Sequence, residues 1–260
     1  MKLSLCLEML FTDRPFIDRL AIASRLGYRA IEFWDWRDKD LVALADTAAQ
    51  HGLTVAAMSG NRRHALIDPE SRNGLLEEME PVFAAARFLD CRHIMMLSDV
   101  LNQDGSAAAT KPRPAAEKIE SIAEHLTALA GEAEKAGVTL LLEPLNTALD
   151  HTGCFLNHSA PAVEIVKHVN KPQVKLLYDI YHMSMMGEDV LTEIDGNLEW
   201  IGYLHVADMP GRHQPGTGRI DYQAVNTLLK RAGFDGFIGM EFSALGADEL
   251  AATAALEVFG

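Results

Sequence analysis

Short apolar runs alternate with longer amphipathic segments along the whole chain. The runs predict eight β-strands, at Leu3–Leu7, Ala30–Phe33, Thr54–Met58, His93–Leu97, Thr139–Leu142, Val174–Tyr178, Ile201–Leu204 and Phe237–Met240. Apolar residues at helical spacing predict the intervening helices, at Phe16–Leu26, Leu41–His51, Leu75–Leu89, Ala115–Ala136, Ala160–Val169, Val190–Leu198, Tyr222–Ala232 and Asp248–Val258. Strands that alternate with helices pair in parallel through right-handed crossovers, so the pattern predicts an α/β fold.

The count of helix–strand units favours a closed barrel. Eight units close a (β/α)8 TIM barrel, and such barrels typically have about 250 residues. No linker or low-complexity stretch divides the chain, so we expect one TIM-barrel domain over residues 1–260. The alternative is an open doubly wound sheet. No G-x-G-x-x-G motif follows the first strand, which disfavours a dinucleotide-binding sheet, and we expect no organic cofactor.

Composition narrows the classes of function. The three cysteines are scattered and form no C-x-x-C pair, which is typical of a reducing cytosol. The sequence shows no recognisable signal peptide and no apolar run that approaches the length of a bilayer span. We therefore expect a cytoplasmic protein that does not associate with a membrane. The formal net charge of −14 disfavours binding to nucleic acid, since a duplex-binding surface is rich in lysine and arginine.

Polar residues follow directly after four consecutive predicted strands. They are Glu143, Asp179, His205 and Glu241. One such residue could simply cap the next turn, but the carboxyl ends of barrel strands converge on one mouth, where barrel enzymes carry their chemistry. Three carboxylates in one mouth repel each other unless a cation neutralises them. An oxygen-rich set with one imidazole suits Mg²⁺, Mn²⁺ or Co²⁺, so we predict one divalent metal ion.

Three further side chains lie near the predicted mouth. His182 follows the sixth strand, and Arg212 stands in a glycine- and proline-rich loop after the seventh. A guanidinium offers a bidentate fork for a carboxylate or for sugar oxygens. Trp34, in an aromatic stretch after the second strand, would cover the apolar face of a small polar ligand or belong to an aromatic cluster beneath a loop.

The most basic segment of the chain is GNRRH, residues 60–64, after the third strand. It also falls at the predicted mouth. We expect Arg62 and His64 to contact substrate, and either Arg212 or the pair Arg62 and Arg63 to hold a substrate carboxylate. Local cations in an otherwise acidic protein favour an anionic substrate.

Four segments together resemble the hydroxypyruvate isomerase family of the xylose-isomerase-like barrels. They are LLLEPLNT (140–147), LLYDIYHM (176–183), HVADMPGRHQPGTGRIDY (205–222) and GFIGMEF (236–242). The likeness covers most of the chain and is sharpest from Glu143 onward, with PGTG as its most specific element. The resemblance implies metal ligation by the four strand-end residues. It also implies that Glu143 and Glu241 act as the acid/base pair and that His182 and Arg212 contact substrate.

The same resemblance implies an aldose–ketose type isomerisation through an enediolate, with hydroxypyruvate giving tartronate semialdehyde. The first half departs from the family at Cys6, at Glu8 and in residues 34–40 and 59–69, where loops shape the substrate pocket. A ketose 3-epimerase or another short-chain sugar isomerase of the same fold therefore stays open as an alternative, and a non-catalytic sugar-binding barrel is a more remote one. A DNA-repair endonuclease of this fold would need more strand-end histidines and a basic groove. Barrels of this kind often associate, so a homo-oligomer is compatible with the sequence.

Overall fold

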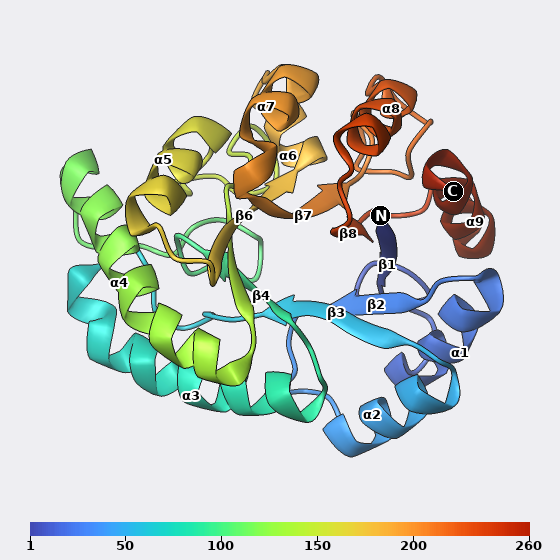
Figure 1. The fold of residues 1–260 in the computed structure, drawn as a ribbon, viewed down its shortest axis with the longest axis horizontal. Coiled ribbons are helices and arrows are strands. Elements are labelled where there is room, and N and C mark those ends of the chain that lie inside the picture. Colours follow the sequence, from blue (N-terminus) through green and yellow to red (C-terminus); the bar gives the residue numbers. More distant parts are fainter.

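Eight parallel strands close into a barrel in the computed structural model, which describes residues 1–260 (Figure 1). The strands are β1 (Lys2–Cys6), β2 (Ala30–Phe33), β3 (Thr54–Ser59), β4 (His93–Leu97), β5 (Thr139–Glu143), β6 (Val174–Asp179), β7 (Ile201–Val206) and β8 (Phe237–Met240). Each strand pairs with its neighbours in chain order, and β8 pairs with β1. The predicted TIM barrel is confirmed.

Helices surround this barrel as a ring, in which α9 follows α8 and lies beside α1 (Figure 1). They are α1 (Phe16–Leu26), α2 (Leu41–Gln50), α3 (Arg72–Phe88), α4 (Ala115–Ala136), α5 (Ser159–Val169), α6 (Ile180–Met185), α7 (Val190–Asn197), α8 (Tyr222–Ala232) and α9 (Asp248–Phe259), with short 3₁₀ turns at Pro69–Ser71 and Leu198–Trp200. All eight predicted helices are present, within three residues at each end. None has both the length and the apolar character needed to cross a membrane.

Left-handed glycines end several of these helices. Gly27 (φ +106°) and Gly137 (φ +70°) donate their N–H groups back to the last turn of α1 and α4. Because glycine has no Cβ, it adopts this conformation without strain, and the chain turns at once into the next strand. Gly27 and Gly137 thus each end a helix just before a strand begins.

The core has two parts. A large apolar layer fills the space between strands and helices, and a smaller cluster of seven buried residues fills the barrel interior. Small side chains on β2 and β3, at Ala30, Ala56 and Ala57, share this interior with the larger Leu141 and Tyr203. Because side chains fill the barrel interior, the polar residues at the carboxyl ends of the strands rest on a packed core and not on an open pore.

Register places three of the four strand-end residues close together. Asp179 pairs with His205, which pairs in turn with Gly239, two residues before Glu241. Glu143 pairs with Leu97 of β4. The strands β5, β6 and β7 extend through their polar residues, one or two positions beyond the predicted ends. The difference arises because the neighbouring strand still supplies a partner there.

Candidate functional site

The four strand-end residues converge at the carboxyl ends of β5 to β8. Glu143, Asp179, His205 and Glu241 are all buried, and one potential ligand atom of each lies within 4.8 Å of the others. His205 Nδ1 lies 3.6 Å from an oxygen of Glu143 and 3.6 Å from an oxygen of Glu241. Asp179 Oδ2 is 3.9 Å from the same nitrogen. The structure therefore brings together the four residues that the sequence singled out.

His205 is held from behind by a residue that the sequence analysis missed. Its Nε2 lies 3.0 Å from Oε1 of Glu32, which is buried within β2, and its Nδ1 faces the carboxylates of the cluster. Neither ring nitrogen has a hydrogen bond of good geometry within the protein. The hydroxyl of Tyr203 also donates to Glu32. A carboxylate that fixes the outer nitrogen of an imidazole is the usual support for a metal-binding histidine. The unpartnered, buried Nδ1 thus fits the role of a ligand.

Electrostatics at the cluster favour a cation. Burial raises the pKa of Glu143, and it raises the pKa of Asp179 to about 7. The pKa of His205 is raised, because Glu241 and Glu32 outweigh the opposite effect of burial. The pKa of Glu241 is lowered, since His205 and Arg212 outweigh its burial. For Glu143 and Asp179, burial outweighs the positive charges of His205 and Arg212, and a divalent cation would favour the ionised form of both carboxyl groups.

Arg212 reaches the same cluster from the loop after β7. Its guanidinium bonds to Glu241 and lies 5.5 Å from the ring centroid of Tyr181. Its backbone has a positive φ of 54°, which is uncommon for a residue with a Cβ. The loop therefore holds Arg212 in a specific orientation toward the acidic residues.

That loop is wound around Asp208, another buried carboxylate that the sequence analysis did not single out. Asp208 accepts hydrogen bonds from backbone N–H groups at four positions, namely Met209, Gly216, Gly218 and Ile220. A Cβ at Gly218 would lie 2.2 Å from the Met209 carbonyl oxygen and 2.5 Å from Asp208 Oδ1. This close approach explains why the PGTG segment ends in glycine.

His182 lies on α6, a short helix in a segment that the sequence analysis treated as loop. Asp179 begins this helix by accepting the His182 N–H at 2.9 Å, so it caps a turn as well as joining the cluster. Asn146 Oδ1 accepts two backbone N–H groups, and its Nδ2 therefore faces His182 Nδ1, at 2.6 Å. Burial lowers the pKa of His182. The ring is thus neutral, with its hydrogen on Nε2.

Trp34 contacts the cluster directly. Its indole N–H donates to Glu241 Oε1 at 2.8 Å, and its side chain lines the cavity above the site. The sequence predicted that Trp34 would form an apolar wall of the pocket or belong to an aromatic cluster beneath a loop. The structure adds a polar contact that orients one of the two glutamates.

A cavity of about 290 Å³ opens at this mouth. Of the predicted site residues, it is lined by Trp34, Arg62, Glu143, His182, Arg212 and Glu241. Asn102, Gln103 and His151 also line it, and the sequence offered no pattern that marked them. His151 lies beside His182, with ring centroids 5.1 Å apart, and its Nδ1 is fixed by the Gly105 carbonyl at 2.9 Å.

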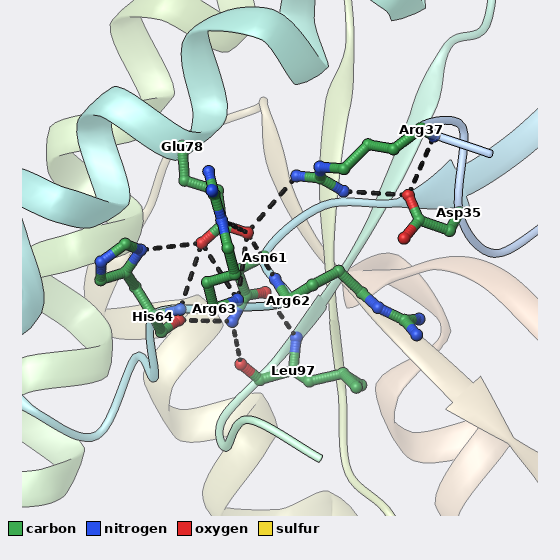
Figure 2. A network of polar contacts seen from close by, with 8 residues as sticks. All are labelled: Asp35, Arg37, Asn61, Arg62, Arg63, His64, Glu78 and Leu97. Carbon is green, nitrogen blue, oxygen red and sulfur yellow. Dashed lines mark hydrogen bonds and ion pairs between the residues drawn. The ribbon is translucent and has the colours of Figure 1, made fainter. Parts of the chain in front are cut away.

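His64 does not line this cavity. Its Nδ1 lies 3.0 Å from Glu78, a buried carboxylate on α3, which also accepts its backbone N–H (Figure 2). Arg63 likewise has its Nε 3.6 Å from Glu78. Of the three basic residues in this segment, only Arg62 therefore lies with the other candidate residues at the cavity. The side chains of Arg63 and His64 contact Glu78 instead.

Comparisons with known proteins agree with this architecture. A family model described as the xylose isomerase-like TIM barrel matches residues 20–259. A 2-oxo-tetronate isomerase from Cupriavidus necator is 29% identical over 247 residues, covering 91% of this chain and 90% of that protein. A hydroxypyruvate isomerase from Escherichia coli is 26% identical, covering 93% of each.

Solved structures share the fold. The AP endonuclease, family 2 from Brucella melitensis is similar with a TM-score of 0.87, at 25% identity and covering 96% of both chains. D-psicose 3-epimerase from Clostridium cellulolyticum H10 has a TM-score of 0.83 at 20% identity, covering 100% of this chain and 98% of that one. The family match spans nearly the whole barrel. The chain therefore belongs to the xylose isomerase-like TIM barrels and is an isomerase of the hydroxypyruvate isomerase family among them.

Proposed function

We propose that this protein interconverts a small hydroxy-keto acid and its aldehyde isomer, with hydroxypyruvate and 2-hydroxy-3-oxopropanoate (tartronate semialdehyde) as the pair. One observation carries the proposal. Glu143 and Glu241 come from β5 and β8, three strands apart in an eight-stranded barrel, yet both line one cavity and both lie 3.6 Å from His205 Nδ1. Two carboxylates that reach one substrate from different strands suit a proton transfer between adjacent carbons.

The isomerisation moves one hydrogen and leaves the composition unchanged. One glutamate removes a proton from C3 of hydroxypyruvate, and the electron pair of that C–H bond enters a C2–C3 enediolate. The other glutamate delivers a proton to C2. The C3 hydroxyl gives up its proton and becomes the aldehyde, while the C2 carbonyl oxygen gains one and becomes the hydroxyl. General acid/base catalysis of this kind contributes about 10²–10⁴-fold to a rate.

The cluster also suits a metal. Glu143, Asp179, His205 and Glu241 would hold the ion, with Glu32 orienting the imidazole. A bound Mg²⁺, Mn²⁺ or Co²⁺ supplies Lewis-acid stabilisation of the negative charge that develops on the substrate oxygens. Trp34 and Arg212 both donate hydrogen bonds to Glu241. These bonds would hold the Glu241 carboxylate in place while it transfers a proton.

The remaining cavity residues would bind the substrate. The neutral His182 offers its Nε2–H to a substrate oxygen, and Arg212 offers the part of its fork that Glu241 does not occupy. Arg62 contributes a second cation to the lining. Both curated relatives are named for acids, 2-oxo-tetronate and hydroxypyruvate, which supports a carboxylate substrate.

A ketose 3-epimerase is the second candidate, because it would use the same metal cluster and the same glutamates. Cationic Arg62 in the cavity favours an acid over a neutral sugar. A DNA-repair endonuclease is disfavoured by a cluster with a single histidine and by the net charge of −14. A non-catalytic sugar-binding barrel would have no need for two opposed glutamates.

A side-by-side assay tests the proposal. Protein supplied with Mn²⁺ is incubated with hydroxypyruvate, a tetrulose, D-fructose and D-tagatose, and the products are separated and identified. We expect hydroxypyruvate to be converted with the highest kcat/KM. Preferential inversion of a ketose at C3 would assign the protein to the epimerases instead, and binding without conversion of any compound would favour the non-catalytic alternative.

A further inference from the structure

Glu78 is a buried carboxylate with no direct part in the metal cluster. It lies midway along α3 with a side chain that is 0% exposed. Three consecutive backbone N–H groups donate to it, from Arg62 at 2.9 Å, Arg63 at 3.1 Å and His64 at 3.1 Å (Figure 2). The Arg37 guanidinium lies 3.4 Å away. A buried charge is retained only where its hydrogen bonds are complete, and here they organise a single turn after β3.

The same turn is fixed on its other side by β4. The amide of Asn61 donates to the Leu97 carbonyl at 2.9 Å and accepts the Leu97 N–H at 3.0 Å. Gly60 packs so closely that a Cβ there would lie 2.6 Å from Met96 Sδ and 2.7 Å from Ile94 Cγ2. The turn is therefore held at both ends, and the direction of each side chain on it is determined.

The three basic side chains of the turn point in different directions. His64 and Arg63 are turned to Glu78, whereas Arg62 extends away from it (Figure 2). Arg62 lines the cavity, and its guanidinium forms no hydrogen bond or ion pair within the chain. Asp35, which Figure 2 shows nearby, is engaged by Arg37 at 3.1 Å. Arg62 is thus a cation presented to the cavity with its donors free.

Its place in the barrel gives Arg62 a specific use. It follows β3, which stands opposite β7 in the closed barrel, so it faces the acid/base cluster across the mouth. Arg212, the other arginine of the cavity, is bonded to Glu241. A substrate whose reacting carbons lie at the cluster would therefore present its other end toward Arg62, where a carboxylate would gain charge-assisted, bidentate hydrogen bonds.

We propose that Arg62 is the carboxylate anchor of the cavity and that Glu78 is the positioning residue that directs it there, so that the pair restricts the substrate to short acids. This inference rests on the proposed isomerase function, which supplies the reacting end of the molecule. It assigns the specificity to a helix residue that touches no substrate. Without Glu78, the three N–H groups of the turn lose their acceptor and the turn can present Arg62 in other directions.

The test compares hydroxypyruvate with dihydroxyacetone, which carries CH2OH in place of the carboxylate. Turnover of the acid and solvent-deuterium exchange into the neutral ketose are measured with Mn²⁺ present. Arg62→Met should raise KM for hydroxypyruvate by about tenfold to a hundredfold, as expected for lost charge-assisted hydrogen bonds, and leave kcat nearly unchanged. Exchange into dihydroxyacetone should keep its wild-type rate. Arg63→Met, one residue along, is the matched control and should change neither.

Glu78→Gln should reproduce this split of KM against kcat with a smaller rise, and it should add little in a protein that already carries Arg62→Met. A merely structural role for Glu78 would instead lower kcat for both compounds. Equal loss with acid and neutral substrate, or additive effects of the two substitutions, would overturn the positioning role. Should Glu78→Gln fail to fold, Arg62→Met still decides the anchor, since Arg62 is exposed and bonds through its side chain to nothing.

A binding measurement separates this inference from the proposed function. D-glycerate, an unreactive acid, is titrated into wild-type protein and Arg62→Met by calorimetry. Loss of glycerate affinity in the variant supports the anchor even if wild-type protein leaves hydroxypyruvate unchanged, an outcome that would overturn only the isomerisation. An unchanged glycerate affinity overturns the anchor, whatever the enzyme converts.

Discussion

Two loops bring an arginine to the mouth of this barrel, and each is folded around a buried carboxylate. The loop after β7 carries Arg212 and is wound on Asp208, which belongs to the loop itself. The turn after β3 carries Arg62 and is wound on Glu78, which comes from α3. Arg212 bonds to Glu241 of the cluster, whereas Arg62 is exposed and free.

This difference suggests separate roles for the two arginines, with Arg212 acting at the reacting centre and Arg62 in substrate recognition. If Glu241 transfers a proton, as we propose, the arginine bonded to it is part of the reacting centre, and a change in its loop should affect every substrate. An arginine that faces the cavity with free donors should matter only for a substrate with a matching negative charge. Both loops use the same device, because a buried carboxylate surrounded by backbone N–H groups fixes a turn without requiring regular secondary structure.

The largest expected effect follows from Glu241→Gln. The substitution removes the carboxylate that Arg212 bonds and abolishes its capacity to accept a proton, so kcat should fall by about 10²–10⁴-fold with every substrate. Turnover of hydroxypyruvate is measured with metal content determined on the same sample. A variant that binds metal and keeps the wild-type rate would remove Glu241 from the acid/base pair.

Glu32→Gln should lower the metal affinity of the cluster without altering either arginine loop. Its carboxylate lies 3.0 Å from His205 Nε2, and loss of such a partner typically lowers metal affinity by about 10–100-fold. Titration of metal-free protein with Mn²⁺ measures the change. The KM for hydroxypyruvate at saturating metal should stay near the wild-type value; a Mn²⁺ affinity equal to that of wild type would refute the supporting role.

Asp208→Asn tests the loop of Arg212. Four backbone N–H groups lose a charged acceptor, and unsatisfied buried donors typically cost about 1–3 kcal/mol in the free energy of unfolding. Urea denaturation measures this loss. In contrast to Glu78→Gln, the variant should lower kcat for hydroxypyruvate and for dihydroxyacetone alike. An effect confined to the acid would abolish the distinction between the two loops.

Salt should reveal the smallest difference. Arg62 is exposed, and charges in contact with solvent are screened over about 10 Å at 0.1 M salt. The KM for hydroxypyruvate should therefore rise a few-fold between low and high NaCl, while kcat, which depends on the buried centre, stays constant. Arg62→Met should flatten the KM profile. A salt dependence that persists unchanged in this variant would place the relevant cation elsewhere.

The sequence predicted the barrel and the four strand-end residues for a physical reason. Each polar residue follows an apolar run directly, and parallel strands must bring such positions to one mouth. Glu32 was not predicted because it lies within a strand, where a polar residue fits the usual alternation of buried and exposed side chains. Its burial against Tyr203 and His205 depends on strands far away in the chain.

The arginine loops show a second limit. Arg62 and His64 are two residues apart, and nothing in GNRRH distinguishes the one that reaches the cavity. The distinction comes from Glu78, at least fourteen positions further along the chain, whose carboxylate gathers the backbone of the turn. A charged residue within an amphipathic helix is usually solvated, so no local pattern marks it as buried. Tertiary contacts of this kind become visible only in the folded chain.

Deuterium exchange with and without metal tests the central claim most directly. Protein is treated with EDTA, dialysed and incubated with hydroxypyruvate in D2O, before and after addition of Mn²⁺, and deuterium at C2 of the product and C3 of the substrate is followed by NMR. If the buried cluster holds the ion and its glutamates move the proton, exchange should be absent after chelation, return with Mn²⁺, and stay absent in Glu143→Gln. Full exchange in excess EDTA, or at the wild-type rate in Glu143→Gln, would contradict that claim.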